Sequence, residues 1–235
     1  MEDLAEWVVS KALELGAEYA DIRIELYNTA RIEVSDGSVE KSTLGFNAGA
    51  GVTVLANGAW GFSTSTVLNK EKLLEAVEFA VKSAKTIGEK SAEKVSLKEV
   101  SIVKDTVKKL GSRKLEDVPI EEKLDLVLKA DSSMRQVDKR VRSTQIVYSE
   151  THGRKIFASS LGSLIVFEGA RCYISFTAVA READRIQSYR SRVAQYGGWE
   201  GFEAQKPMDK ALEAARKARE AIYYSLGSPA FIRMA

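Results

Sequence analysis

Residues 52–65 read VTVLANGAWGFSTS, so two strand-like runs flank the pair Asn57-Gly58. Two such runs joined by Asn-Gly are typical of a tight β-hairpin, because the turn needs positive φ values that asparagine and glycine tolerate. A second hairpin signal, Asp36-Gly37, separates the alternating run that ends at Val34 from the next run, which begins at Val39. Consecutive hairpins pair their strands in antiparallel fashion, so this part of the chain predicts an antiparallel meander.

Helical periodicity flanks this meander and returns in the second part of the chain. Apolar spacing predicts helices over about residues 4–15, from about residue 69, from Pro119 and from Pro207. Further strands are expected near Val141 and at 156–158, 163–181 and 186–193, with turns at His152-Gly153, at Leu161-Gly162 and near Asp184. We therefore predict an α+β fold in which helices cover antiparallel meanders, in two similar helix–meander–helix halves.

The same pattern gives expected domain boundaries. Residues 1–95 form one helix–meander–helix subdomain, 96–118 a connector, 119–227 a second such subdomain, and 228–235 an atypical tail. The connector is rich in Lys, Glu and Ser, with room for one short strand near 99–103. The echo between the halves has two explanations, a duplication or simply a common way to close an α+β layer.

The composition excludes several kinds of chemistry. The 235 residues include 35 Lys and Arg, 33 Asp and Glu, one His and one Cys, with a formal net charge of +2. One cysteine excludes an intramolecular disulfide, and one histidine excludes a two-histidine metal site. No apolar run approaches the roughly 18 residues of a membrane span. The acidic start, Met1-Glu2-Asp3, is unlike a targeting signal, so a cytoplasmic protein without membrane contact is expected.

Single residues and motifs give weak functional signals. The glycines between Gly45 and Gly61 run into a strand rather than a helix, so strand bends or close packing is favoured over a phosphate loop. His152 is expected in a solvated turn, and Cys172 is expected to be a buried structural thiol. Glu182 and Asp184 flank an expected reversal, which favours a turn role over paired acid–base chemistry.

Two basic sets are candidate contacts for nucleic-acid phosphates. They are Arg135, Lys139, Arg140 and Arg142, and then Arg171, Arg181, Arg185, Arg190 and Arg192. Tyr173, Phe176 and Tyr189 lie nearby and could stack on bases. Asp138, Glu182 and Asp184 interleave with these cations, and the overall charge is nearly balanced. A solvated sheet face of mixed charge is therefore favoured, and nucleic acid is the less favoured partner.

The order of several short motifs resembles the amino-terminal region of the TldD/PmbA family. The motifs are Glu18–Arg23, Ser35–Glu40, Gly49–Leu55 and Gly58–Thr64, followed by Val179–Glu182 and Gly197–Glu203. The form Gly-x-Trp-Gly-Phe-Ser-Thr at Gly58–Thr64 is similar to the TldD type rather than the PmbA (TldE) type. The resemblance covers residue 1 to about residue 225.

This resemblance implies a subunit of a zinc-dependent peptidase in which a TldD-type and a TldE-type chain pair and cleave small or unfolded peptides. The family's zinc ligands and general base come from a His-Glu-x-x-x-His motif in its carboxy-terminal half, where zinc activates the attacking water. This sequence has no His-Glu pair. We therefore expect no catalytic residue, metal ligand or cofactor in this chain, and a truncated, split or stand-alone amino-terminal domain.

The sequence thus predicts the non-catalytic amino-terminal domain of a TldD-like zinc-dependent peptidase subunit, which shapes the peptide cleft and the subunit contacts. Trp60 and Phe62 are the candidate substrate-binding residues, although core packing is favoured for both. The expected partners are a TldE/PmbA-type or identical subunit and unfolded or small peptides, which can add as a strand to a sheet edge. The alternatives are a stand-alone assembly or regulatory module without enzymatic activity, and a nucleic-acid binder that uses the arginine-bearing sheet.

Overall fold

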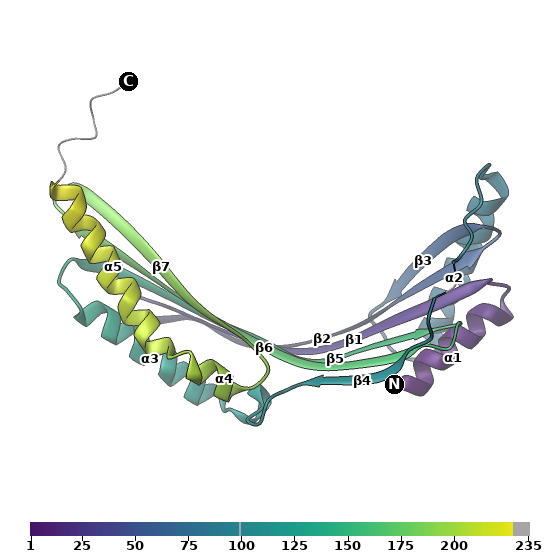
Figure 1. Ribbon diagram of the computed structural model, residues 1–235, viewed down its shortest axis with the longest axis horizontal. Coiled ribbons are helices and arrows are strands. Elements are labelled where there is room, and N and C mark those ends of the chain that lie inside the picture. Colours follow the sequence, from purple (N-terminus) through teal and green to yellow (C-terminus); the bar gives the residue numbers. More distant parts are fainter. Residues whose placement is uncertain (99, 228–235) are drawn as a thin grey trace, which may run out of the picture. The chain divides into compact units, whose positions relative to one another are not determined.

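The computed structural model describes residues 1–98 and 100–227, so the expected tail at 228–235 lies outside the described residues. Seven strands form one sheet in the order β3-β2-β1-β5-β6-β4, and β7 also pairs with β6 (Figure 1). The strands are β1 (Tyr19–Ser35), β2 (Ser38–Ala56), β3 (Ala59–Ser65), β4 (Lys104–Lys109), β5 (Val141–Ser159), β6 (Leu164–Glu182) and β7 (Arg185–Tyr196). The helices are α1 (Glu2–Glu14), α2 (Lys70–Lys90), η1 (Leu115–Asp117), α3 (Ile120–Gln136), α4 (Trp199–Ala204) and α5 (Pro207–Gly227). The α+β class with antiparallel pairing is confirmed.

Two compact units share the long strands. The first unit consists of Met1–Asn28, Phe46–Lys108 and Gly153–Gly169, and the second consists of Thr29–Gly45, Lys109–His152 and the chain from Ala170 onward. Strands β1, β2, β5 and β6 contribute to both units. The packing therefore does not divide the chain at a linker, and the boundaries expected from the sequence stay a prediction.

In the first unit, α1 and α2 pack together on one face of the sheet. The buried strand residues alternate with exposed ones, and they include Ile22, Ile24, Val52 and Val54. They meet the apolar stripe of α2, which contains Leu73, Val77, Ala80 and Ala84. Helix α2 begins where Asn69 accepts a hydrogen bond from the Lys72 backbone N–H through its side chain (2.8 Å), a favourable N-cap. The other face of this sheet carries no helix of the unit, and we call it the first open face.

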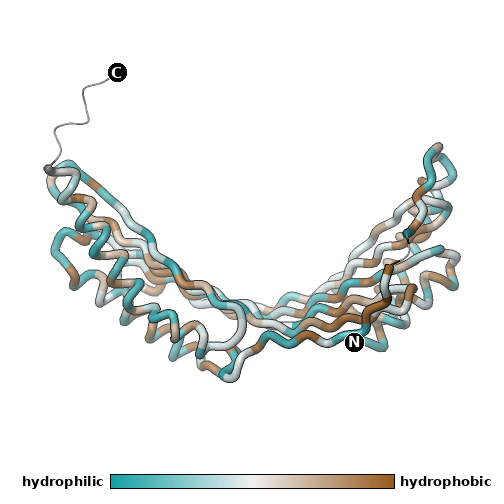
Figure 2. The backbone as a smooth tube through the Cα atoms, viewed as in Figure 1, coloured by the Kyte–Doolittle hydropathy of each residue, from teal (hydrophilic) through white to brown (hydrophobic). Residues whose placement is uncertain are grey.

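In the second unit, α3, α4 and α5 cover one face of the sheet. The strands alternate apolar and polar residues along their length (Figure 2). The covered face carries Ile146, Tyr148, Ile174 and Phe176, which pack with Trp199 and Phe202 of α4. We call the face away from these helices the second open face. None of the helices in the described part of the chain is long and apolar enough to cross a membrane, and the cytoplasmic location stays a prediction.

The turns at Asp36-Gly37 and Asn57-Gly58 are confirmed, since all four residues have positive φ. The turn expected at His152-Gly153 is wrong, because β5 runs without a break from Val141 to Ser159 and includes the expected short strand at 156–158. A Cβ at Gly153 would clash with the carbonyl oxygen of Leu26 on the neighbouring strand. This glycine therefore marks a close backbone approach inside a sheet rather than a reversal. The connector strand lies at Lys104–Lys109, slightly later than the expected 99–103.

Candidate functional site

Trp60 and Phe62 lie on the first open face. Gly61, between them, faces α2, where a Cβ would clash with the Ala80 carbonyl oxygen. Because side chains alternate along a strand, Trp60 and Phe62 must then point away from the helices. Their side chains are 40% and 59% exposed. The core packing that the sequence favoured for both residues is therefore wrong, and their role in substrate binding stays a prediction.

A trough runs beside these aromatic residues, over the glycine-rich part of β2. Strand β2 pairs with β3 so that Gly51 lies opposite Thr64, and a Cβ at Gly51 would lie 3.2 Å from the Phe62 ring. The missing side chains leave a pocket of about 390 Å³ on this face. Its lining residues are Arg23, Glu25, Tyr27, Asn47, Ala48, Gly49, Ala50, Gly51, Thr64, Ser65 and Thr66. The glycines thus serve close packing, as the sequence indicated, and they also form the floor of a cavity.

The charged side chains beside this trough are paired. Asp21, only 5% exposed, accepts hydrogen bonds from Arg23 Nη1 (2.7 Å) and Tyr19 Oη (3.1 Å). Burial, above all, raises the pKa of Asp21 and raises that of Tyr19 to about 12. Lys155 Nζ lies 2.8 Å from Glu25 Oε1, and hydrogen bonding to Glu25 raises the pKa of Lys155. These contacts neutralise the charges, so the trough offers mainly apolar and backbone surface to a ligand.

The second open face is different, because it carries arginines from β6 and β7. The register places Arg171 opposite Tyr196, Ser175 opposite Arg192 and Thr177 opposite Arg190. Cross-strand partners share a face, and the neighbouring residues Cys172, Ile174 and Phe176 belong to the helix-covered core. These arginines are exposed, and Arg190 Nε donates to Thr177 Oγ1 (2.9 Å).

A second pocket, of about 470 Å³, lies at one end of these paired strands. It is lined by Ser149, Glu150, Thr151, Arg171, Cys172, Tyr173, Ala194, Gln195 and Tyr196. Glu150 and Cys172 are almost fully buried on the helix-covered side, so the exposed wall comes from Arg171, Tyr196 and their neighbours. This arrangement offers a guanidinium, hydroxyl groups and aromatic rings around one hollow.

Beneath this pocket lies a buried ion pair. Lys123 Nζ donates to Glu150 Oε1 (2.8 Å) and to the Leu115 carbonyl oxygen (2.8 Å), and Tyr148 Oη donates to the other carboxylate oxygen. Both charged side chains are 4% exposed. The cluster ties η1 and α3 to β5, and burial raises the pKa of Tyr148. Cys172 is buried, as expected of a structural thiol, and burial raises its pKa to about 12.

The other residues that the sequence singled out have structural partners. His152 lies in β5 with Nδ1 3.4 Å from Glu116 Oε2, and its side chain is 14% exposed. Ala183 and Asp184 form the turn between β6 and β7, so the turn role of Asp184 is confirmed. Arg135, of the first basic set, pairs with Asp131 (2.9 Å), so its charge is neutralised.

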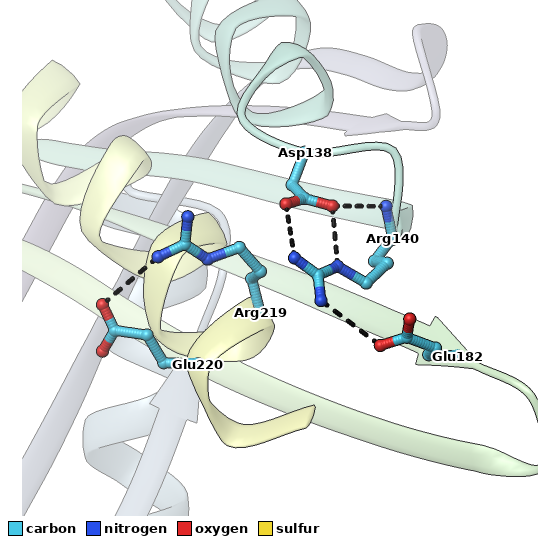
Figure 3. Close-up of polar contacts among 5 residues, drawn as sticks. All are labelled: Asp138, Arg140, Glu182, Arg219 and Glu220. Carbon is cyan, nitrogen blue, oxygen red and sulfur yellow. Dashed lines mark hydrogen bonds and ion pairs between the residues drawn. The ribbon is translucent and has the colours of Figure 1, made fainter. Parts of the chain in front are cut away.

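Arg140 of that set is also neutralised, as Figure 3 shows. Its guanidinium donates to both carboxylate oxygens of Asp138 (2.9 Å each) and to Glu182 Oε2 (3.3 Å). The side-chain hydrogen bonds from Arg140, assisted by its backbone N–H, hold the pKa of Asp138 well below its usual range. This cluster fixes the turn between α3 and β5 to the end of β6 and leaves Arg140 without free charge for a ligand.

A zinc site does not fit the described residues. Within 1–98 and 100–227, no three His, Cys, Asp or Glu side chains are grouped so that they could hold a metal ion. No chemical step through zinc is therefore assigned to residues of this chain.

Neither the trough on the first open face nor the row of arginines on the second open face could be predicted from the sequence alone. The Gly-x-Gly pattern and the alternating arginines were visible, but strand register decides which residues lie opposite them. The position of the helices then decides which face stays open.

Known proteins resemble the chain along most of its length. The family model of the PmbA/TldA metallopeptidase domain 1 matches residues 20–84, and that of the PmbA/TldA metallopeptidase central domain matches residues 113–222. A metalloprotease of Methanocaldococcus jannaschii is 35% identical over 212 residues, which cover 89% of this chain and 46% of the relative. A metalloprotease of Methanothermobacter thermautotrophicus is 30% identical over 207 residues, which cover 88% and 44%.

A solved structure shows the same fold. TldE from Thermococcus kodakarensis superposes with a TM-score of 0.72 at 15% identity, over 92% of this chain and 47% of that one. The chain spans about half the length of the curated relatives that it matches.

Proposed function

Because the chain belongs to the PmbA/TldD metallopeptidase family, we propose that it is the amino-terminal, non-catalytic region of a TldD-like zinc-dependent peptidase subunit. Its role is to shape the cleft for small or unfolded peptides and to contact a TldE/PmbA-type or identical subunit. The zinc and the residues that act on the scissile bond are supplied, in this proposal, by sequence of the family's second half.

The observation that carries this proposal is the trough on the first open face. Phe62 is more than half exposed beside a glycine floor, and Trp60 follows on the same face. Exposed aromatic rings that border a hollow are typical of a ligand-binding surface. Arg23 is paired with Asp21, and Glu25 is paired with Lys155. This surface is therefore close to neutral, which suits a peptide whose sequence varies.

The test is calorimetric titration of the full chain with an uncharged, unstructured peptide of about 12 residues, enough to span the sheet when extended. Phe62→Ser should weaken binding about tenfold, because a buried aromatic contact contributes about 1–2 kcal/mol. Phe79→Ser is the matched control, since Phe79 on α2 is 62% exposed but lies away from the open face. The proposal fails if the unmodified chain binds no peptide, or if both variants weaken binding equally.

A second candidate role, a subunit contact, is favoured by the edge of β2. Strand β3 pairs with β2 only over Ala50–Ala56, so in the second unit the outer edge of residues 38–45 has no neighbouring strand among the described residues. This edge carries Val39 and Leu44, which are 46% and 72% exposed. Exposed edges with apolar residues pair readily with another chain.

Sedimentation of the full chain tests this role. Leu44→Lys should shift the chain toward monomer, because a lysine on an edge strand opposes pairing. An unchanged distribution of species would remove β2 as the contact.

A further inference from the structure

The second open face is unusual in its charge. On the three neighbouring strands β5, β6 and β7, alternate residues point toward this face. They are Ser143, Gln145, Val147, Ser149 and Thr151; Arg171, Tyr173, Ser175, Thr177, Val179 and Arg181; and Ile186, Ser188, Arg190, Arg192, Ala194 and Tyr196. These positions hold four arginines and no carboxylate, although the whole chain has nearly equal numbers of acidic and basic residues.

The four arginines are also without acidic partners. None of the ion pairs found among the described residues includes Arg171, Arg181, Arg190 or Arg192. Glu33, on the strand β1 that adjoins β5, is already bonded to Arg31 (3.1 Å) and to the Gln145 side chain (3.0 Å). In the same unit, Arg135 and Arg140 are by contrast paired with Asp131 and Asp138.

We propose that this face binds an acidic polypeptide in extended conformation, so that aspartate and glutamate side chains meet the arginines of β6 and β7. The inference rests on the proposed peptide-binding function and specifies the class of peptide. Arginine presents a planar fork of N–H donors that matches a carboxylate. The pocket beside Arg171, with the Ser149 and Thr151 hydroxyls on its wall, accommodates one acidic side chain at the end of the row.

The spacing of the arginines along β7 matches the side-chain spacing of an extended peptide. Arg190 and Arg192 are two residues apart on one strand, which places their side chains about 6.6–6.8 Å apart along it. An extended peptide projects alternate side chains with the same period. A single-stranded nucleic acid would need aromatic platforms between the cations. The residues directly opposite Arg190 and Arg192 are Thr177 and Ser175 instead, and the tyrosines of the face, Tyr173 and Tyr196, lie toward its Arg171 end.

The experiment measures fluorescence anisotropy of two labelled peptides of about 12 residues with the full chain. One peptide is rich in Asp and Glu, and the other carries Asn and Gln at the same positions. We expect the acidic peptide to bind about five- to thirtyfold more tightly in dilute salt, with the advantage falling as salt is added. The pair Arg190→Gln and Arg192→Gln should remove most of that advantage.

The matched control is the pair Arg216→Gln and Lys217→Gln, which removes the same charge from exposed positions on α5. Equal affinity for the two peptides, or equal loss in both variant pairs, would overturn the acidic preference while leaving the proposed function intact. If neither peptide binds, the proposed function itself fails. Tighter binding of a single-stranded oligonucleotide than of the acidic peptide would also overturn the inference.

Discussion

The two open faces are built on the same strands but offer different chemistry. On the first, Arg23 and Lys155 are each held by a carboxylate, and the exposed surface is aromatic with a glycine floor. On the second, Arg190 and Arg192 have no acidic partner among the residues that the structure describes, and hydroxyl side chains lie opposite them. Strand β6 contributes to both units, yet its arginines Arg171 and Arg181 lie only in the second.

This difference separates two sources of affinity. Binding at the first face should depend on apolar burial and change little with salt, whereas binding at the second should weaken as salt screens exposed charges. The two faces can therefore be tested independently by the peptide experiments on Phe62 and on Arg190 with Arg192.

Beneath the second face lies the buried pair of Lys123 and Glu150. Lys123→Met should lower the free energy of unfolding by about 3–5 kcal/mol, because the buried Glu150 carboxylate would lose its cationic partner. Urea denaturation measures this loss. Alkylation of Cys172, which packs in the same core, should become faster as the unit opens.

Lys129→Met is the control, since Lys129 pairs with Asp125 in solvent, with side chains 68% and 59% exposed. It should change stability by less than about 1 kcal/mol. Adding Glu150→Gln to Lys123→Met should restore part of the loss, because the uncompensated charge is removed. A loss in Lys123→Met no greater than in Lys129→Met would show that the ion pair does not support this unit.

The first face depends on Gly61. Gly61→Ala places a Cβ against the Ala80 carbonyl oxygen and 3.0 Å from Ala84 Cβ, so α2 must shift on the sheet. We expect a loss of about 3 kcal/mol in the free energy of unfolding. Amide hydrogen exchange should accelerate most in α2 and β3.

Gly49→Ala makes the same change on the open side of the strand pair. Its Cβ would meet Ser65 O at 3.5 Å, an ordinary contact, and stability should change by less than about 1 kcal/mol. Similar losses in the two variants would mean that the approach of α2 to β3 does not set the direction of Trp60 and Phe62.

Local turn chemistry explains how much of this fold was predictable. Asp36-Gly37 and Asn57-Gly58 were located because their backbone needs a positive φ that few residue pairs tolerate. Gly153 was misread as a turn because the same residue type serves another purpose, the close approach of two strands. Only tertiary structure, not sequence spacing, distinguishes these two uses of glycine.

The candidate surfaces were predictable to a lesser degree. Trp60 and Phe62 were identified by their residue type, but an alternating aromatic pair fits a covered face as well as an open one. The basic sets were visible as well, and the interleaved acids led to the expectation of neutral, mixed charge. That expectation is met at Arg140, which pairs with Asp138, and not at Arg190, because the acids lie elsewhere in space.

The smallest expected effect concerns the neutralised cluster at Asp138, the counterpart of the unpaired arginines. In the folded chain the pKa of Asp138 is lowered by Arg140, so the folded state binds fewer protons at this site than the unfolded state. The stability that Asp138 contributes is therefore present above its unfolded pKa of about 4 and is lost as the pH falls through the folded pKa.

Asp138→Asn should lower stability near neutral pH and flatten the dependence of stability on pH below about 4. Thermal unfolding as a function of pH measures this, with Asp125→Asn as the exposed control. Unchanged acid sensitivity in Asp138→Asn would mean that Arg140 is as free as Arg190, and the contrast between the two basic sets would disappear.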